Sequence, residues 1–291
     1  MNEHSGMYTF ANGQWEPHKT TQSTNLVNFQ QLKVVTYNIH FETQNYETRM
    51  NGIIHELQQQ DADVVCLQEM IPLFLPVFTK NIWIQENYIL SDWKEGKSLR
   101  PYGVLILTKL KHVRIQLRTI DMVTNMNRKL QVLDTTINGH KIHFATAHFE
   151  SLEYNKHYRR NQFLQAMRDS VHYNASAAIL VGDFNMSHED EEDAVFDCYG
   201  FSDCWDMLRP NDLGHTMGIN IPHPQYGPIR FDRVKLWQYQ DILEPISIET
   251  FGDKPIPLEI LGDTVVSSGY CERFPSDHLG ICAIFKVNVE A

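Results

Sequence analysis

Short apolar runs that end on a polar side chain are the feature that most constrains this chain. Such runs recur between residues 33 and 287, and four of them end in groups that can bind a metal or a phosphate: residues 34–38 (Asn38), 64–69 (Glu69), 144–148 (His148) and 179–185 (Asp183 and Asn185). A short, continuously apolar run is typical of a strand buried on both faces. A polar group at its end then lies at a sheet edge, where ligand clefts form.

Other runs extend this pattern into a fold. Residues 102–107, 231–236 and 280–285 are predicted strands, and residues 130–137 and 141–146 flank Asn138-Gly139, which predicts a hairpin of antiparallel neighbours. Helical spacing of apolar residues predicts helices over 50–57 and 163–171. We therefore expect stacked sheets with helices outside them, in a single catalytic domain over residues 31–291. Residues 1–30 lack periodicity apart from a turn at Asn12-Gly13, and are expected to form a loosely ordered N-terminal arm.

Composition narrows the class of protein. The net charge of −11 argues against a protein that coats nucleic acid with a broad basic face, but it permits an enzyme that grips one phosphate; two local basic clusters lie at 109–114 and 156–160. The five cysteines include no Cys-x-x-Cys pair, so neither a zinc site nor a disulfide framework is expected, and Cys66 and Cys282 are interpreted as buried thiols. With no apolar run of about 20 residues and no signal pattern, the chain is expected to be soluble and intracellular.

Each polar strand end also has a purely structural explanation. Asn38 could simply open a turn, and Asp183-Phe-Asn185 could be an Asx-type turn. His148 could be a half-buried histidine like many others, and Asp232 could form an ion pair within its strand. It is the combination of these groups that predicts one site.

Together the groups supply a coherent chemistry. Glu69 and Asn38 offer the hard oxygen ligands that Mg²⁺ prefers. Asp183 is a candidate to orient or deprotonate an attacking water, and Asn185 could hold a phosphoryl oxygen. His278, if a nearby carboxylate such as that of Asp232 keeps it protonated, could stabilise charge developing at phosphorus.

Four motifs carry a resemblance to a known superfamily. Thr36-Tyr-Asn38, Leu67-Gln-Glu69, Gly182-Asp-Phe-Asn185 and Ser276-Asp-His278, in this order, resemble the signature set of the endonuclease/exonuclease/phosphatase superfamily. The resemblance implies a DNase I-like, four-layered α/β sandwich. Its two packed, mainly antiparallel sheets would be flanked by helices, with the site at one end of the sheets.

Within that superfamily the chain is similar to the 5′-tyrosyl-DNA phosphodiesterases, from about residue 33 to 286. The matching stretches are Leu67–Pro72, His148–Ser151, Arg230–Arg233 and Arg273–His278. This similarity implies Mg²⁺-dependent hydrolysis, with Mn²⁺ as a substitute, of the bond between a protein tyrosine and a DNA or RNA 5′ end, leaving a 5′-phosphate. It implies a nucleic-acid 5′ end carrying a tyrosyl or peptide adduct as partner, no membrane, a monomer, and a nuclear or cytoplasmic location in a eukaryote.

The resemblance also implies a role for each site residue. Glu69 would bind the metal and Asp183 would act as general base. Arg128 looks like the family arginine that approaches the phosphotyrosyl end. Contacts to phosphate would come from Asn38, His148, Ser151, Asn185 and His278, with Asp232 and Asp277 in support.

Two departures from the family pattern bear on the substrate. Leu152-Glu153 stands where relatives have Thr-Arg, and Met217 stands where a Trp borders the nucleic-acid channel. Losing that aromatic would remove about 1–3 kcal/mol of stacking per base. The alternatives are therefore another phosphoesterase of the superfamily (a nuclease, an inositol phosphate phosphatase or a sphingomyelinase) or a non-catalytic binding module. The binding module would require a lost catalytic group, and none is lost.

Overall fold

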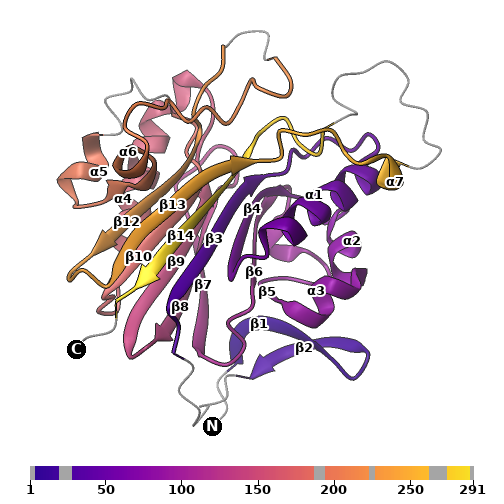
Figure 1. The fold of residues 1–291 in the computed structure, drawn as a ribbon, viewed down its shortest axis with the longest axis horizontal. Helices are drawn as coiled ribbons and strands as arrows, with labels where there is room; N and C mark the ends of the chain where they lie inside the picture. Colours follow the sequence, from indigo (N-terminus) through magenta and orange to yellow (C-terminus); the bar gives the residue numbers. More distant parts are fainter. Residues whose placement is uncertain (1–3, 20–27, 187–193, 223–226, 262–273, 289–291) are drawn as a thin grey trace.

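The computed structural model describes residues 4–19, 28–186, 194–222, 227–261 and 274–288 of the chain. Over these residues two mixed β-sheets pack face to face, and helices cover the outer face of each sheet (Figure 1). The resulting four layers confirm the α/β sandwich expected from the sequence.

The two sheets have eight and six strands. In spatial order the larger sheet consists of β13 (Leu243–Phe251), β14 (Gly280–Val287), β3 (Gln31–Asn38), β4 (Val64–Met70), β6 (Gly103–Thr108), β5 (Ile89–Leu90), β1 (His4–Ala11) and β2 (Gln14–Lys19). The smaller sheet consists of β11 (Ser202–Asp203), β12 (Asp232–Gln238), β10 (Ala177–Asp183), β9 (His140–His148), β8 (Lys129–Ile137) and β7 (Arg114–Asp121). Every predicted strand is present.

The helices lie on both sides of this pair of sheets. The described helices are α1 (Tyr46–Gln60), α2 (Leu75–Lys80), α3 (Ile82–Asn87), α4 (Lys156–Ser170), α5 (Ala194–Cys198), α6 (Cys204–Leu208) and α7 (Leu258–Leu261), with 3₁₀ turns at Lys97–Leu99 and Glu153–Asn155. The two predicted helices are α1 and α4. Ile53 and Leu57 of α1 pack on the larger sheet, and Phe163 and Met167 of α4 pack on the smaller one.

Each interface between layers has its own apolar cluster. Neighbouring residues of one strand enter different clusters: Val34 and Cys66 face the other sheet, whereas Val35 and Leu67 face α1. Because both faces of the central strands are covered, the strands are apolar throughout. This is why they are visible in the sequence as continuous apolar runs.

The pairing of the strands brings the polar strand ends together. In the parallel pair β3–β4, Asn38 is opposite Gln68, one residue before Glu69. In the smaller sheet, Asp183 of β10 is opposite His148 of the parallel strand β9 and opposite Asp232 of the antiparallel strand β12. The β8–β9 hairpin is antiparallel as predicted, with positive φ at both Asn138 and Gly139.

Residues 4–19 differ from the expectation of a loose arm. They form a hairpin of β1 and β2 around Asn12-Gly13, the turn noted in the sequence, and β1 also pairs with β5. Met7 and Trp15 are buried. The sequence of the hairpin shows little regular alternation of apolar and polar residues. The hairpin is ordered because it packs against the rest of the larger sheet.

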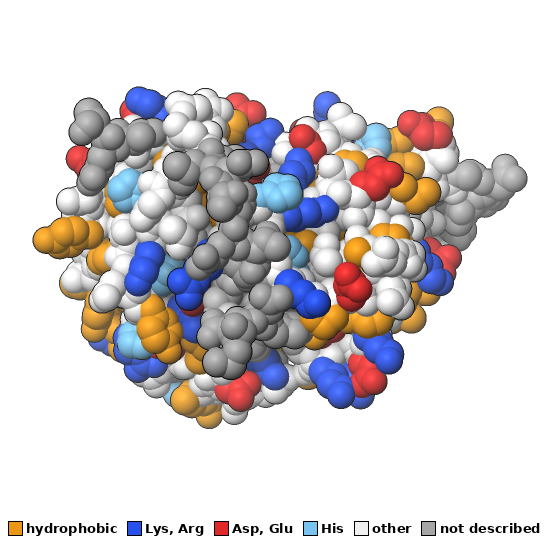
Figure 2. Space-filling model, turned by 90° about the horizontal axis from the view of Figure 1, so that it is seen from below, with side chains coloured by type: hydrophobic (Ala, Val, Ile, Leu, Met, Phe, Trp, Pro, Cys, Tyr) orange, Lys and Arg blue, Asp and Glu red, His pale blue; other side chains and the backbone are white. Residues whose placement is uncertain are grey.

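The two basic clusters lie at opposite ends of the sandwich. Residues 109–114 follow Thr108, which pairs with Val64 at the start of β4, so they are at the end of the sheets away from Glu69. The view from below shows blue Lys and Arg side chains among red carboxylates at that end (Figure 2). Residues 156–160 open α4, shortly after β9 ends at His148.

Two cysteines are buried, as the sequence analysis predicted. Cys66 and Cys282 are buried free thiols, and Cys198 and Cys204 are also free. Cys271 and Arg273 lie outside the described residues. Among the described helices, none is long and apolar enough to cross a bilayer.

Candidate active site

Asn38 joins the ends of the two sheets. Its Nδ2 donates to Oδ2 of Asp183 at 2.9 Å and to Oε1 of Glu69 at 3.2 Å, and the side chain is fully buried. Its Oδ1 accepts the backbone N–H of His40 at 3.0 Å. Asn38 therefore presents its amide nitrogen to both carboxylates, and not the oxygen that a metal ligand would present.

Glu69 sits at a distortion in β4. The β4–β6 pairing shifts register between Leu67 and Met70, and Glu69 has a φ of +62°, which is rare for a residue other than glycine. Burial, followed by repulsion from Asp277, raises the pKa of Glu69 to about 7. A strained residue whose charged form is disfavoured is typical of a functional site.

Asp183 is buried at the end of β10. Its Oδ1 accepts the backbone N–H of Asn185 at 2.9 Å. Burial, and then the charge of Asp232, raises the pKa of the Asp183 carboxyl. A carboxylate with a raised pKa is a stronger general base than an exposed one.

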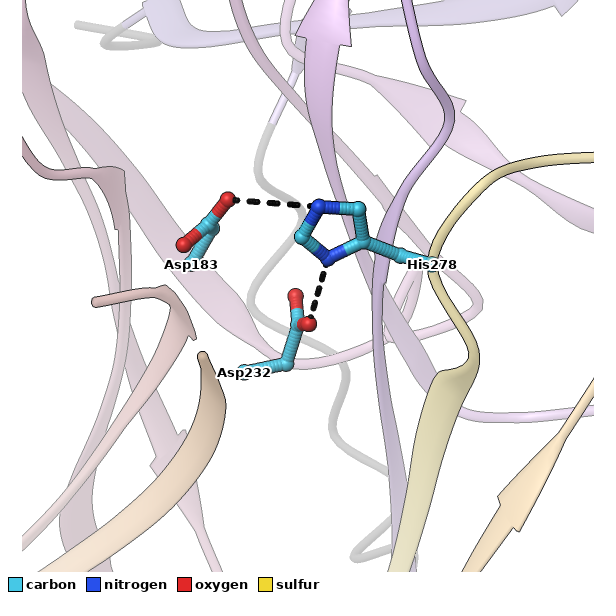
Figure 3. A group of neighbouring side chains, drawn as sticks. All are labelled: Asp183, Asp232 and His278. Carbon is cyan, nitrogen blue, oxygen red and sulfur yellow. Dashed lines mark hydrogen bonds and ion pairs between the residues drawn. The ribbon is translucent and has the colours of Figure 1, made fainter. Parts of the chain in front are cut away.

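His278 lies between two buried carboxylates. Its Nδ1 is 2.7 Å from Oδ2 of Asp232, and its Nε2 is 3.9 Å from Oδ2 of Asp183 (Figure 3). Burial disfavours the imidazolium, but the charge and hydrogen bond of Asp232 outweigh burial and raise the pKa of His278 well above its ordinary value. His278 is therefore protonated at neutral pH.

His148 has the opposite charge state. Its Nε2 is 3.2 Å from Nη2 of Arg128, and because a guanidinium only donates, Nε2 accepts and the ring proton is on Nδ1. Burial and the positive charges of Arg128 and His278 lower the pKa of His148 well below its ordinary value. Its Nδ1 is buried without a hydrogen-bond partner in the described structure, 3.9 Å from Oε1 of Glu69.

These groups surround a cavity of about 530 Å³. The predicted site residues that line it are Glu69, Arg128, His148, Ser151, Asp183, Asn185, Met217, Asp277 and His278. Asn38 and Asp232 do not line it: they are fully buried and contact the lining residues from behind.

The three predicted substrate-binding residues, Arg128, Ser151 and Met217, all line the cavity, and each contacts a different neighbour. Arg128 is buried with its guanidinium 4.9 Å from the ring centre of Tyr102. The hydroxyl of Ser151 is 3.2 Å from the sulfur of Met126. Met217 is held by a backbone bridge to His278, so its side chain enters the cavity beside the imidazolium.

The departure Leu152-Glu153 also lies at the cavity. Leu152 is exposed with a φ of +73°, and the Glu153 carboxylate is 3.9 Å from Nη2 of the buried Arg159. Both residues line the cavity. An additional negative charge therefore stands at its wall.

Six lining residues were not predicted as site residues from the sequence: His40, Phe41, Tyr102, Arg159, Ile229 and Phe231. The rings of Phe41 and Tyr102 are stacked at 5.4 Å. Tyr102 directly precedes β6, which is antiparallel to β4, so the start of β6 meets the same edge as the end of β4. Considering where antiparallel strands begin, as well as where strands end, would have found it.

A geometric group that can hold a metal consists of Asp183, Asp232 and His278, whose ligand atoms lie within 4.8 Å of one another. His278 is protonated and already bonded to Asp232. An imidazolium has no free lone pair, so this group is an acid–base chain and not the better metal site. The carboxylates of Glu69 and Asp277 also face the cavity, and neither has an imidazole as close as that of His278 is to Asp232: Nδ1 of His40 is 3.4 Å from Asp277 and 4.0 Å from Glu69.

A two-sheet sandwich that gathers buried carboxylates, an asparagine and an imidazolium around one cavity defines a class of enzymes that hydrolyse phosphate esters. The sequence profile of the Endonuclease/Exonuclease/phosphatase family matches residues 35–278, and the chain belongs to this family.

Curated relatives and solved structures give further similarities. The chain is 27% identical to tyrosyl-DNA phosphodiesterase 2 of Homo sapiens over 90% of this chain and 70% of that protein, and 28% identical to the Rattus norvegicus protein over 88% and 67%. The structure of D. rerio TDP2 complexed with a single-strand DNA product covers 89% of this chain and 100% of its own, at 23% identity and a TM-score of 0.71. The catalytic domain of human Nocturnin matches at 15% identity, covering 90% and 95%, with a TM-score of 0.64.

Proposed function

We propose that this chain is a divalent-cation-dependent phosphodiesterase that hydrolyses the 5′-phosphotyrosyl bond between a protein tyrosine and a DNA or RNA 5′ end, leaving a 5′-phosphate. The convergence of Glu69, Asp183 and His278 on one cavity of about 530 Å³ carries the proposal. Similarity to the tyrosyl-DNA phosphodiesterases 2 over about nine-tenths of the chain supports this substrate.

The residues present fit a divalent cation beside Glu69. The carboxylates of Glu69 and Asp277 repel each other, which helps to raise the pKa of Glu69 to about 7, and a cation would relieve that repulsion. Glu69 would hold the ion, with Mg²⁺ as the ion expected from the family resemblance. When bound, the cation would neutralise charge on the phosphoryl oxygens.

The remaining residues have roles that follow from their protonation states. Asp183, with its raised pKa, would accept the proton of the attacking water. His278, as an imidazolium, would donate from Nε2 to a phosphoryl oxygen. His148 would donate from Nδ1, which has no hydrogen-bond partner in the described structure, to a phosphate oxygen. Arg128, by donating to Nε2, would keep the ring proton of His148 on Nδ1.

A second candidate is a phosphodiesterase of the same family that acts on a smaller ester. The observation that favours it is Glu153 at the cavity wall, because a carboxylate there repels a polyanion more strongly than a compact ester with one phosphate.

A panel of substrates tests which of these two candidate functions the protein has. Purified protein with Mg²⁺ would be assayed on a 5′-phosphotyrosyl oligonucleotide, an abasic duplex, poly(A), an inositol phosphate and sphingomyelin, with the Asp183→Asn variant as the inactive control. We expect the highest kcat/KM on the phosphotyrosyl oligonucleotide. A higher kcat/KM on any other member would contradict the proposed substrate but retain the chemistry.

A further inference from the structure

His40 is a histidine at the cavity wall that the proposed chemistry does not use. Its Nδ1 is 3.4 Å from Oδ1 of Asp277 and 4.0 Å from Oε2 of Glu69. Two carboxylates from different segments of the chain thus face one imidazole nitrogen at the cavity wall.

The backbone around His40 is held by a buried arginine. Nη1 of Arg49 donates to the carbonyls of Ile39 and Pro275, both at 3.0 Å, and Nη2 donates to the carbonyls of His40 and Glu42. One guanidinium therefore fixes the loop after β3 against the segment that carries Asp277. It also maintains His40 at a φ of +60°, a conformation that a side-chain-bearing residue keeps only where its surroundings impose it.

We propose that His40 is a ligand of the divalent cation beside Glu69, through Nδ1 and together with Asp277, and that this imidazole makes the site select a transition-metal ion such as Mn²⁺ over Mg²⁺. The inference rests on the metal dependence in the proposed function. Mg²⁺ takes oxygen ligands almost exclusively, whereas Mn²⁺, which also binds oxygen, accepts an imidazole nitrogen more readily, so one nitrogen among oxygen ligands raises the affinity for Mn²⁺ relative to that for Mg²⁺.

The two distances from His40 to the carboxylates fit a shared ion. Ligand atoms about 2.1 Å from a six-coordinate ion lie roughly 3.0 Å apart when adjacent and roughly 4.2 Å apart when opposite. The 3.4 Å and 4.0 Å distances from His40 Nδ1 fall between these limits. Among the described residues only Asp183, Asp232 and His278 have ligand atoms that all lie within 4.8 Å of one another, so the carboxylates of Glu69 and Asp277 must move closer together to share one ion with His40.

A second observation points to a ligand in the same space. Nδ1 of His148 is buried, has no hydrogen-bond partner in the described residues, and is 3.9 Å from the other oxygen of Glu69. Because Arg128 occupies its Nε2, this nitrogen carries a proton and cannot bind a metal itself. It can donate to a water or phosphate oxygen on the ion.

Metal titration of the full chain tests the selectivity. Calorimetric dissociation constants for Mn²⁺ and Mg²⁺ would be measured for the wild type, His40→Asp and His40→Gly, two residues that tolerate the left-handed backbone. The expected result is a loss of Mn²⁺ affinity of roughly tenfold or more in both variants. His40→Asp should keep its Mg²⁺ affinity, because it supplies an oxygen ligand. His172→Ala, an exposed histidine remote from the cavity, is the matched control.

Electron paramagnetic resonance provides a readout that a structural role would not change. Mn²⁺ bound to the wild type should show a ¹⁴N coupling from a directly bound imidazole. The coupling should disappear in His40→Asp and persist in His172→Ala. Persistence of the coupling in His40→Asp, or an unchanged ratio of the two dissociation constants, would overturn the proposal.

Glu69→Gln separates this inference from the proposed function. If Glu69→Gln loses both ions while His40→Asp behaves as wild type, the cation site stands and only the His40 assignment fails. If the wild type binds neither ion, or if Glu69→Gln binds as wild type, the cation beside Glu69 is itself refuted.

Discussion

Two buried histidines in the same cavity have opposite charge states, and at the scale of residues this difference organises the site. His278 bonds to the carboxylate of Asp232 and is a cation, whereas His148 faces the guanidinium of Arg128 and is neutral. Burial acts in the same direction on both rings, so the charged partner decides. The cavity thereby has one charged donor and one neutral donor within reach of a phosphate.

The assignment of Asp183 as the base predicts a large kinetic effect. Asp183→Asn removes the proton acceptor but preserves size and most hydrogen bonds, so we expect kcat to fall by about 10²–10⁴-fold with little change in KM. The melting temperature should not decrease, because an ionised carboxylate is costly to bury here. Asp121→Asn, at an exposed position, is the control. A variant with more than a tenth of wild-type kcat would remove Asp183 from the mechanism.

The raised pKa of Glu69 predicts a pH-dependent stability of the metal-free protein. The carboxyl titrates near 7 in the folded protein against 4.5 in the unfolded chain, so its contribution is complete below pH 4.5 and is lost as the pH rises through about 7. The loss is at most about 3.5 kcal/mol, at about 1.4 kcal/mol per pKa unit over about 2.5 units.

Denaturant unfolding at pH 5 and pH 8 in the presence of a chelator measures this loss. Glu69→Gln should have a smaller difference between the two pH values, and added divalent cation should restore the wild type at pH 8. Equal pH dependence in the two proteins would argue against a perturbed Glu69.

At the scale of elements, the loop between β7 and β8 depends on a carboxylate from outside it. Glu150 is fully buried and accepts from Oγ1 of Thr124 at 2.6 Å, from the backbone N–H of Asn125 at 2.8 Å and from Nε2 of Gln162 at 3.1 Å. This loop leads directly into Arg128. Glu150 therefore positions Arg128 without contacting the cavity.

Removing that carboxylate should affect both stability and activity. Glu150→Ala leaves three donors without their acceptor, so we expect a loss of about 1–3 kcal/mol in unfolding free energy, with a reduced kcat/KM. The effect on kcat/KM should largely vanish in an Arg128→Ala background, because both changes act through the same side chain. Glu244→Ala, at an exposed glutamate, is the control. Additive effects of Glu150→Ala and Arg128→Ala on kcat/KM would contradict the coupling.

At the scale of the whole molecule, the hairpin of β1 and β2 completes the larger sheet far from the site. Trp15 packs into the apolar cluster under the helices, and its indole Nε1 donates to the carbonyl of Thr79 in α2 at 3.0 Å. Gly6 of β1 also lies against Leu117 of β7, so the hairpin contacts both sheets. It stabilises the sandwich without forming part of the cavity.

Truncating Trp15 should therefore separate stability from catalysis. Trp15→Ala should cost about 3 kcal/mol or more in unfolding free energy. At a temperature where the variant remains folded, kcat should equal that of the wild type. Tyr239→Ala, at an 81% exposed aromatic residue, should change neither. A Trp15→Ala variant with wild-type stability would mean that the hairpin is only loosely attached, as the sequence had suggested.

Local patterns account for most of the fold that the sequence predicted. The central strands and helices α1 and α4 have patterns set by burial on one or two faces, and the β8–β9 turn needs residues that accept positive φ. Strands β7 and β13 were missed because they lie at sheet edges, where exposed charged residues interrupt the apolar pattern. The β1–β2 hairpin was missed because its order comes from other segments.

The polar strand ends from which the site was inferred were sufficient, by themselves, to predict which residue types meet at one site. Burial patterns that the sequence carries set the register of the strands, whereas strand order and direction, which bring these ends together, are given by the tertiary structure. Only the tertiary structure decided the charge of His148 and His278, the orientation of the Asn38 amide, and the place of His40 between two carboxylates. The reason is physical: each of these properties depends on contacts between residues far apart in the chain. The charges that act on a buried group come from those distant residues, and the local sequence around the group does not show them.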